Sequence, residues 1–179
     1  MTSRRIAVLA LVALLLTGCG DAVAPTATAP AATPGDAVPT VVDATLGWLR
    51  DRTFDCVGPT VGTGGSRLWL CTLDMALGND ASNRTLYTVT LFATSAGLTE
   101  LHAIVDQSRN PALNVDFAKG FLADTIAGSP ATGDAGARLV PWVETNLQTG
   151  GAATIGSIRL TLSPYRPISE IDLGFVSGS

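Results

Sequence analysis

The chain has 179 residues, with 11 Lys and Arg against 15 Asp and Glu, which gives a formal net charge of −4. This acidic balance argues against a nucleic-acid partner and against membrane attachment through a basic patch. With three cysteines and one histidine, the chain offers few of the side chains that metal sites and nucleophilic catalysis most often use.

A basic and then apolar segment begins the sequence. Two arginines precede an apolar run over residues 6–16, which is too short to span a bilayer as a lone helix. The run ends in Leu16-Thr17-Gly18-Cys19. Basic residues, a short apolar run and small residues in this order are typical of a secretory signal.

The Leu16-Thr17-Gly18-Cys19 motif resembles the lipobox of bacterial lipoproteins. The resemblance implies that residues 1–18 are a signal peptide, and that Cys19 becomes the acylated first residue of a lipoprotein on the extracytoplasmic side of the cell membrane. Two or more acyl chains anchor a protein stably where one is marginal. Removal of the signal leaves 9 basic against 15 acidic side chains, a net charge of −6. The arginine pair leaves open whether export is general or by the twin-arginine route.

Residues 19–37 are rich in Ala, Thr and Pro and contain almost no bulky apolar side chain. Such a segment cannot bury enough surface to offset the entropy of ordering it. We therefore expect a disordered tether over residues 19–37, followed by a single domain over residues 38–179.

The periodicity of apolar residues changes several times after the tether. Apolar residues at helical spacing predict a helix over residues 39–52, and alternation predicts three strands near residues 67–75, 87–93 and 101–105. Helical spacing returns after Asn110-Pro111, over residues 117–126, and again over residues 139–147. Two alternating segments, 158–162 and 171–175, predict a final hairpin.

Strands that alternate between apolar and polar residues fit an antiparallel sheet with one buried and one wet face. The sequence therefore predicts an α+β domain with an antiparallel sheet of four to five strands, covered on one face by helices, in the order α-β-β-β-α-α-β-β.

Cys56 and Cys71 form an even pair once Cys19 is acylated. Outside the cytosol such a pair is normally a disulfide. Their spacing does not match a redox Cys-x-x-Cys motif, and two cysteines alone do not make a zinc site. We predict a structural Cys56–Cys71 bridge.

His102 is the only histidine, and alternation places it on the same strand face as Glu100 and Asp106. A carboxylate beside an imidazole can poise a general base or bind a metal weakly. However, no Ser lies in a Gly-x-Ser-x-Gly turn and no second His completes a metal pair. We therefore expect no catalytic residues, no metal site and no cofactor.

Charges in the last hairpin predict its register. If Ile158, Leu160 and Leu162 face the core, Arg159 points to the other face together with Glu170 and Asp172. A turn centred near Tyr165 would then bring Arg159 into contact with Glu170 or Asp172.

Tyr165 lies between prolines in a turn, where its ring would be exposed, so it is the candidate ligand-contact residue. Three functional classes fit the chain: a membrane-anchored binding or interaction module for an envelope protein or a small ligand, an envelope hydrolase that uses carboxylates, and a structural envelope lipoprotein without a ligand. The anchor, the tether and the lack of a catalytic motif favour the first class.

Overall fold

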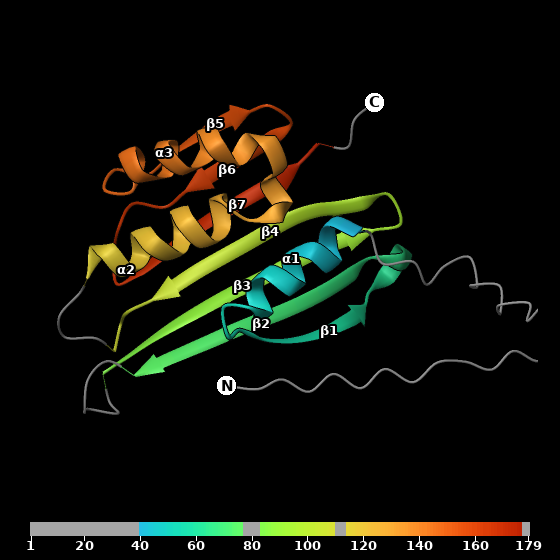
Figure 1. Cartoon of the computed structure of the whole chain (residues 1–179), viewed down its shortest axis with the longest axis horizontal. Coiled ribbons are helices and arrows are strands. Elements are labelled where there is room, and N and C mark those ends of the chain that lie inside the picture. Colours follow the sequence, from blue (N-terminus) through green and yellow to red (C-terminus); the bar gives the residue numbers. More distant parts are fainter. Residues whose placement is uncertain (1–39, 77–82, 110–113, 177–179) are drawn as a thin grey trace, which may run out of the picture. The chain divides into compact units, whose positions relative to one another are not determined.

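The computed structural model describes residues 40–76, 83–109 and 114–176 of the chain. These residues form a seven-stranded sheet in the order β1-β2-β3-β4-β7-β6-β5 (Figure 1). Every neighbouring pair in it is antiparallel. The strands are β1 Asp55–Val61, β2 Arg67–Ala76, β3 Arg84–Thr94, β4 Gly97–Asp106, β5 Gly151–Ile155, β6 Ile158–Leu162 and β7 Ile168–Phe175.

The helices pack on one face of this sheet (Figure 1). They are α1 Thr40–Arg50, α2 Val115–Lys119, the π-helical continuation η2 Gly120–Ala127, the 3₁₀ segment η3 Pro130–Ala135 and α3 Gly136–Asn146. A short 3₁₀ turn, η1 Thr63–Gly65, connects β1 to β2 and buries no residue. We call the face beneath the helices the covered face and the opposite one the open face. None of the helices that the structure describes is long and apolar enough to cross a bilayer.

Strand β4 shows how alternation produces the two faces. Leu101, Ala103 and Val105 are at most 1% exposed and meet the helices, whereas His102 and Ile104 are half-buried on the open face. Apolar side chains from the helices complete the core: Val42, Leu46 and Leu49 of α1, Phe121, Leu122 and Ile126 of η2, and Leu139 and Val143 of α3.

The predicted sheet of four to five strands is wrong, because β1 and β5 are also present. These two are the edges of the sheet. Strand β1 contains Gly58-Pro59 and is mostly exposed, while β5 begins with Gly-Ala-Ala and buries no residue fully. An edge strand that buries no residue fully has only a weak alternating pattern, so its sequence carries little strand signal.

The other predicted elements are found with shifted ends. The helix predicted over 39–52 is α1, and the three central strands are longer than their alternating segments. Asn110-Pro111 lies outside the described residues. The described part of this helical region begins at Asn114, which caps α2 by accepting a hydrogen bond from the Asp116 amide at 2.9 Å. The signal peptide and tether predicted over residues 1–37 also lie outside the described residues.

The last hairpin forms between β6 and β7, with Ile158, Leu160 and Leu162 buried and Arg159 exposed on the open face, as predicted. The predicted contact of Arg159 with Glu170 or Asp172 is wrong. Arg159 pairs with Gly174, and no ion pair of the described residues includes Arg159. The pairing is centred between residues 166 and 167 rather than on Tyr165, which displaces every partner toward the C-terminus.

Candidate functional site

The covered side of the sheet contains a hollow of about 280 Å³. It lies where the chain leaving α1 meets β2, β3 and the α2–η2 segment, and we call it the α1–α2 hollow. Its apolar walls are Phe54, Leu73, Met75, Tyr87, Phe117 and Phe121, and Arg52, Asp116, Gly120 and Thr125 complete it.

Aromatic rings at the base of the hollow are held in fixed contact. The Phe121 ring centroid lies 4.8 Å from that of Tyr87 and 6.0 Å from that of Phe54. All three side chains are at most 6% exposed. Alternation along β3 turns Tyr87 toward the helices, and this burial raises the pKa of its hydroxyl. The base is therefore a rigid aromatic surface.

Arg52 supplies a positive charge at the wall of the hollow. Its Cζ lies 3.3 Å from the centroid of the Trp48 ring, and its Nη1 donates a hydrogen bond to the Trp48 carbonyl at 3.2 Å. Trp48 is itself held, because its Nε1 donates to the Thr125 carbonyl at 3.1 Å. No carboxylate of the described residues forms an ion pair with Arg52. The guanidinium is thus positioned but not neutralised by a partner.

Asp116 supplies the opposing charge. It lies exposed in the first turn of α2. The pKa of nearby Lys119 is raised chiefly by its hydrogen bond and attraction to Glu144, with a smaller contribution from Asp116. Asp116 is therefore a solvated rim charge that also acts on Lys119.

Gly120 leaves room in the hollow. It has ordinary helical backbone angles, and no described atom outside its own helix backbone lies within 4 Å of the position its Cβ would take. A larger side chain at this position can therefore enter the hollow without backbone strain.

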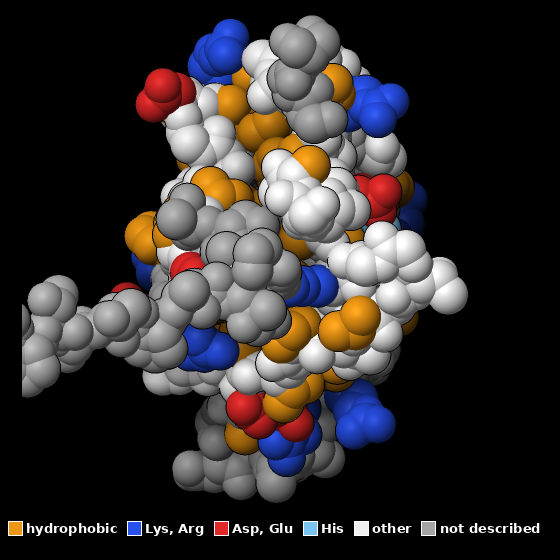
Figure 2. Space-filling model, turned by 90° about the vertical axis from the view of Figure 1, so that its right-hand side faces the viewer, with side chains coloured by type: hydrophobic (Ala, Val, Ile, Leu, Met, Phe, Trp, Pro, Cys, Tyr) orange, Lys and Arg blue, Asp and Glu red, His pale blue; other side chains and the backbone are white. Residues whose placement is uncertain are grey.

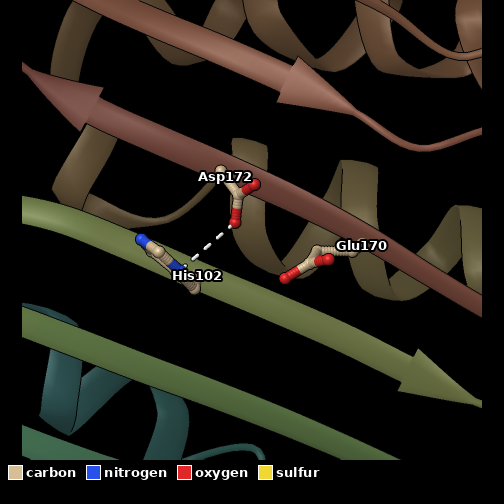
Figure 3. Close-up of side chains that lie close together, drawn as sticks. All are labelled: His102, Glu170 and Asp172. Atoms are coloured by element: carbon tan, nitrogen blue, oxygen red, sulfur yellow. Dashed lines mark ion pairs between the residues drawn. The ribbon is translucent and has the colours of Figure 1, made fainter.

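A second group of polar side chains lies on the open face, where the helices are behind the sheet (Figure 3). His102 of β4 is paired in the sheet with Asp172 of β7, and Glu170 comes two residues earlier on the same strand. His102 Nδ1 lies 3.4 Å from Asp172 Oδ1, and His102 Nε2 lies 3.0 Å from Glu100 Oε2. The Phe92 ring supports the imidazole at a centroid distance of 5.1 Å. The one histidine thus has a carboxylate at each ring nitrogen.

Glu100, His102 and Asp172 border a shallow hollow of about 290 Å³, to which Arg159 and Thr161 of β6 also contribute. On the side shown in Figure 2, hydrophobic side chains are interspersed with basic and acidic ones, so this side gives little support for a broad apolar docking surface.

The predicted Cys56–Cys71 disulfide is confirmed. It joins directly opposed residues of β1 and β2. Cys19 lies outside the described residues, so its acylation stays a prediction.

Tyr165 lies in the predicted turn, but its ring is half-buried against the core. Its hydroxyl donates to Gln107 Oε1 at 3.1 Å, and its amide donates to the Leu147 carbonyl at 2.8 Å. These contacts give Tyr165 a packing role, and its ligand contact stays a prediction.

His102 shares the open face with Glu100, as predicted, but sequence analysis missed Glu170 and Asp172 as its neighbours. The α1–α2 hollow was missed as well. Both depend on which distant segments lie side by side. The predicted pairing of β6 with β7 did not extend to β4, which the structure places beside β7.

Comparison of the chain with protein-family models, with curated proteins and with solved structures finds no match. The function is therefore argued from the geometry of the sites.

Proposed function

We propose that the protein is a lipoprotein anchored through Cys19 on the extracytoplasmic side of a cell membrane, and that its folded part is a binding module. The ligand site is the α1–α2 hollow, and the ligand is a small amphipathic anion with an apolar body and one carboxylate or phosphate group.

The export part of the proposal is supported by two independent features. The lipobox-like motif ends at Cys19, and the chain's other two cysteines are joined as a disulfide. Disulfides persist in oxidising compartments outside the cytosol. An exported chain is thus consistent with both.

The single observation that carries the ligand class is the position of Arg52 at an aromatic hollow. Ligand sites are mostly apolar, with a few polar groups that fix orientation. The rings of Phe54, Tyr87 and Phe121 provide the apolar base. Arg52 is oriented by Trp48 before any ligand arrives, so binding an anion costs little ordering of this side chain.

Membrane attachment is tested by growing cells with radiolabelled fatty acid. The wild-type chain should carry the label in the membrane fraction, and Cys19→Ser should lose it. A wild-type chain without label would contradict the anchor.

Ligand binding is tested with 4-phenylbutyrate and the uncharged 4-phenyl-1-butanol as a matched pair. We expect the carboxylate to bind more tightly by about tenfold, since a charge-assisted hydrogen bond contributes roughly 1.4 kcal/mol or more. Amide chemical shifts measured by NMR should change in α1, at the end of β2 and in α2–η2.

Three variants locate the site. Gly120→Leu should fill the hollow and abolish binding of both compounds, while thermal unfolding shows that the fold is kept. Arg52→Gln should remove only the preference for the carboxylate, and Asp116→Asn should strengthen it. Equal binding of the two compounds, or binding that survives Gly120→Leu, would contradict the proposal.

A further inference from the structure

We propose that the open face binds one divalent cation of the Zn²⁺ class, held by His102 Nδ1 and the carboxylates of Glu170 and Asp172. We call these three residues the His102 cluster. This inference does not rest on the proposed function, because the cluster lies on the opposite face of the sheet from the α1–α2 hollow.

The first argument is the hydrogen-bond chemistry of the imidazole. A neutral imidazole has one N–H donor and one nitrogen lone pair. Glu100 Oε2, at 3.0 Å from Nε2, is placed to accept the N–H. In the tautomer that carries its proton on Nε2, the lone pair of Nδ1 faces Asp172 Oδ1 at 3.4 Å. Two electron-rich atoms face each other, and a cation between them would satisfy both.

Asp172 provides the second argument. Its Oδ1 is buried, and among the described residues it has no hydrogen-bond partner. A buried oxygen without a hydrogen-bond partner is costly, and a carboxylate oxygen more so. The Asp172 side chain as a whole is 40% exposed, so rotation of its carboxylate would bring this oxygen to an ion from solvent.

The third argument is geometric. One donor atom each from His102, Glu170 and Asp172 lie within 4.8 Å of one another (Figure 3). Donors bound to Zn²⁺ at about 2.0–2.2 Å are roughly 3.5 Å apart, so modest side-chain rotation closes the site. The backbone needs no movement, because β4 and β7 are paired directly.

The donor set selects the class of metal. Nitrogen together with carboxylate oxygen suits Zn²⁺ and its neighbours in the transition series, whereas Ca²⁺ and Mg²⁺ take oxygen donors. Glu100 would act as the outer carboxylate that orients a metal-bound imidazole. Three protein donors leave a coordination position for water. Arg159 borders the same hollow and opposes the cation.

The test uses the full chain in detergent, freed of metal by a chelator and titrated with ZnCl₂ by calorimetry. We expect one Zn²⁺ per chain. His102→Gln and Asp172→Asn should each weaken binding by at least about tenfold, and Glu100→Gln by about tenfold. Arg159→Gln should strengthen it. Asp106→Asn, on the same strand face, is the matched control and should leave Zn²⁺ binding unchanged. Titration of the wild-type chain with CaCl₂ in place of ZnCl₂ should show no binding.

A spectroscopic readout separates metal binding from a second proton on the ring. The chain has one histidine, so the ring nitrogen signals of ¹⁵N-labelled protein belong to His102 alone. Equimolar Zn²⁺ should shift the Nδ1 signal most strongly. If both nitrogens are protonated and unaffected by Zn²⁺, or if His102→Gln binds Zn²⁺ as well as the wild-type chain, the proposal is overturned.

Discussion

The covered and open faces of one sheet differ in what holds their side chains in place. On β4, Leu101 is fully buried beneath the helices, while Ile104 is half-buried on the open face. Apolar burial has no direction, so the covered face needs only hydrophobic side chains of suitable size. The His102 cluster on the open face depends on register, because a shift of β7 against β4 would separate its members. Core packing and the His102 cluster thus lie on opposite faces of the paired strands β4 and β7.

The largest effect expected from this comparison is on stability. Leu101→Ala should lower the free energy of unfolding by about 2–5 kcal/mol, because it removes a fully buried side chain and leaves a cavity. Ile104→Ala on the open face should cost clearly less, since solvent already reaches Ile104. Denaturant unfolding of both variants measures the difference. Equal losses would show that the open face is packed as tightly as the covered one.

The next effect concerns the edge strand β1. The disulfide closes a sequence separation of 15 residues, and such a loop stabilises by about 3 kcal/mol in the chain-entropy model. Because β1 buries few residues, we expect it to depend on this bond more than the central strands do. Unfolding of the wild-type chain with and without a thiol reductant measures the loss without creating a cavity. Unchanged stability after complete reduction would contradict the expectation that β1 depends on the disulfide.

The sequence predicts the covered face of the sheet better than it predicts the side-chain cluster on the open face. The inward positions of Trp69, Cys71 and Tyr87 follow from alternation alone, because burial imposes period two on a central strand. The edge strands β1 and β5 bury no residue fully, so their alternation is too weak to predict them. The partnership of His102 with Asp172 joins residues 70 positions apart in the sequence, and the pairing of β4 with β7 that creates it has no local signal.

The smallest effect is confined to alkaline pH and concerns Tyr87, which faces the helices at 5% exposure. Burial raises the pKa of Tyr87 above its ordinary value of 10.0, because the charged phenolate is poorly solvated there. The unfolded chain therefore releases this proton first. Its contribution to stability is fully present below pH 10 and is lost as the pH rises toward and through the folded pKa.

The free energy of unfolding should accordingly fall above pH 10, and Tyr87→Phe should make this fall less steep while changing little at neutral pH. The pKa of Tyr165, the chain's other tyrosine, is also raised by burial, but its ring is only half-buried. Tyr165→Phe should therefore flatten the alkaline limb less. It also loses the hydrogen bond to Gln107, which should lower stability by about 1 kcal/mol at pH values where the Tyr165 hydroxyl is protonated. Denaturant unfolding across this pH range, with tyrosinate absorbance recorded in parallel, distinguishes the two. A Tyr87→Phe variant with an unchanged alkaline limb would mean that solvent reaches this hydroxyl through the α1–α2 hollow, and that the base of the hollow is less closed than its ring contacts indicate.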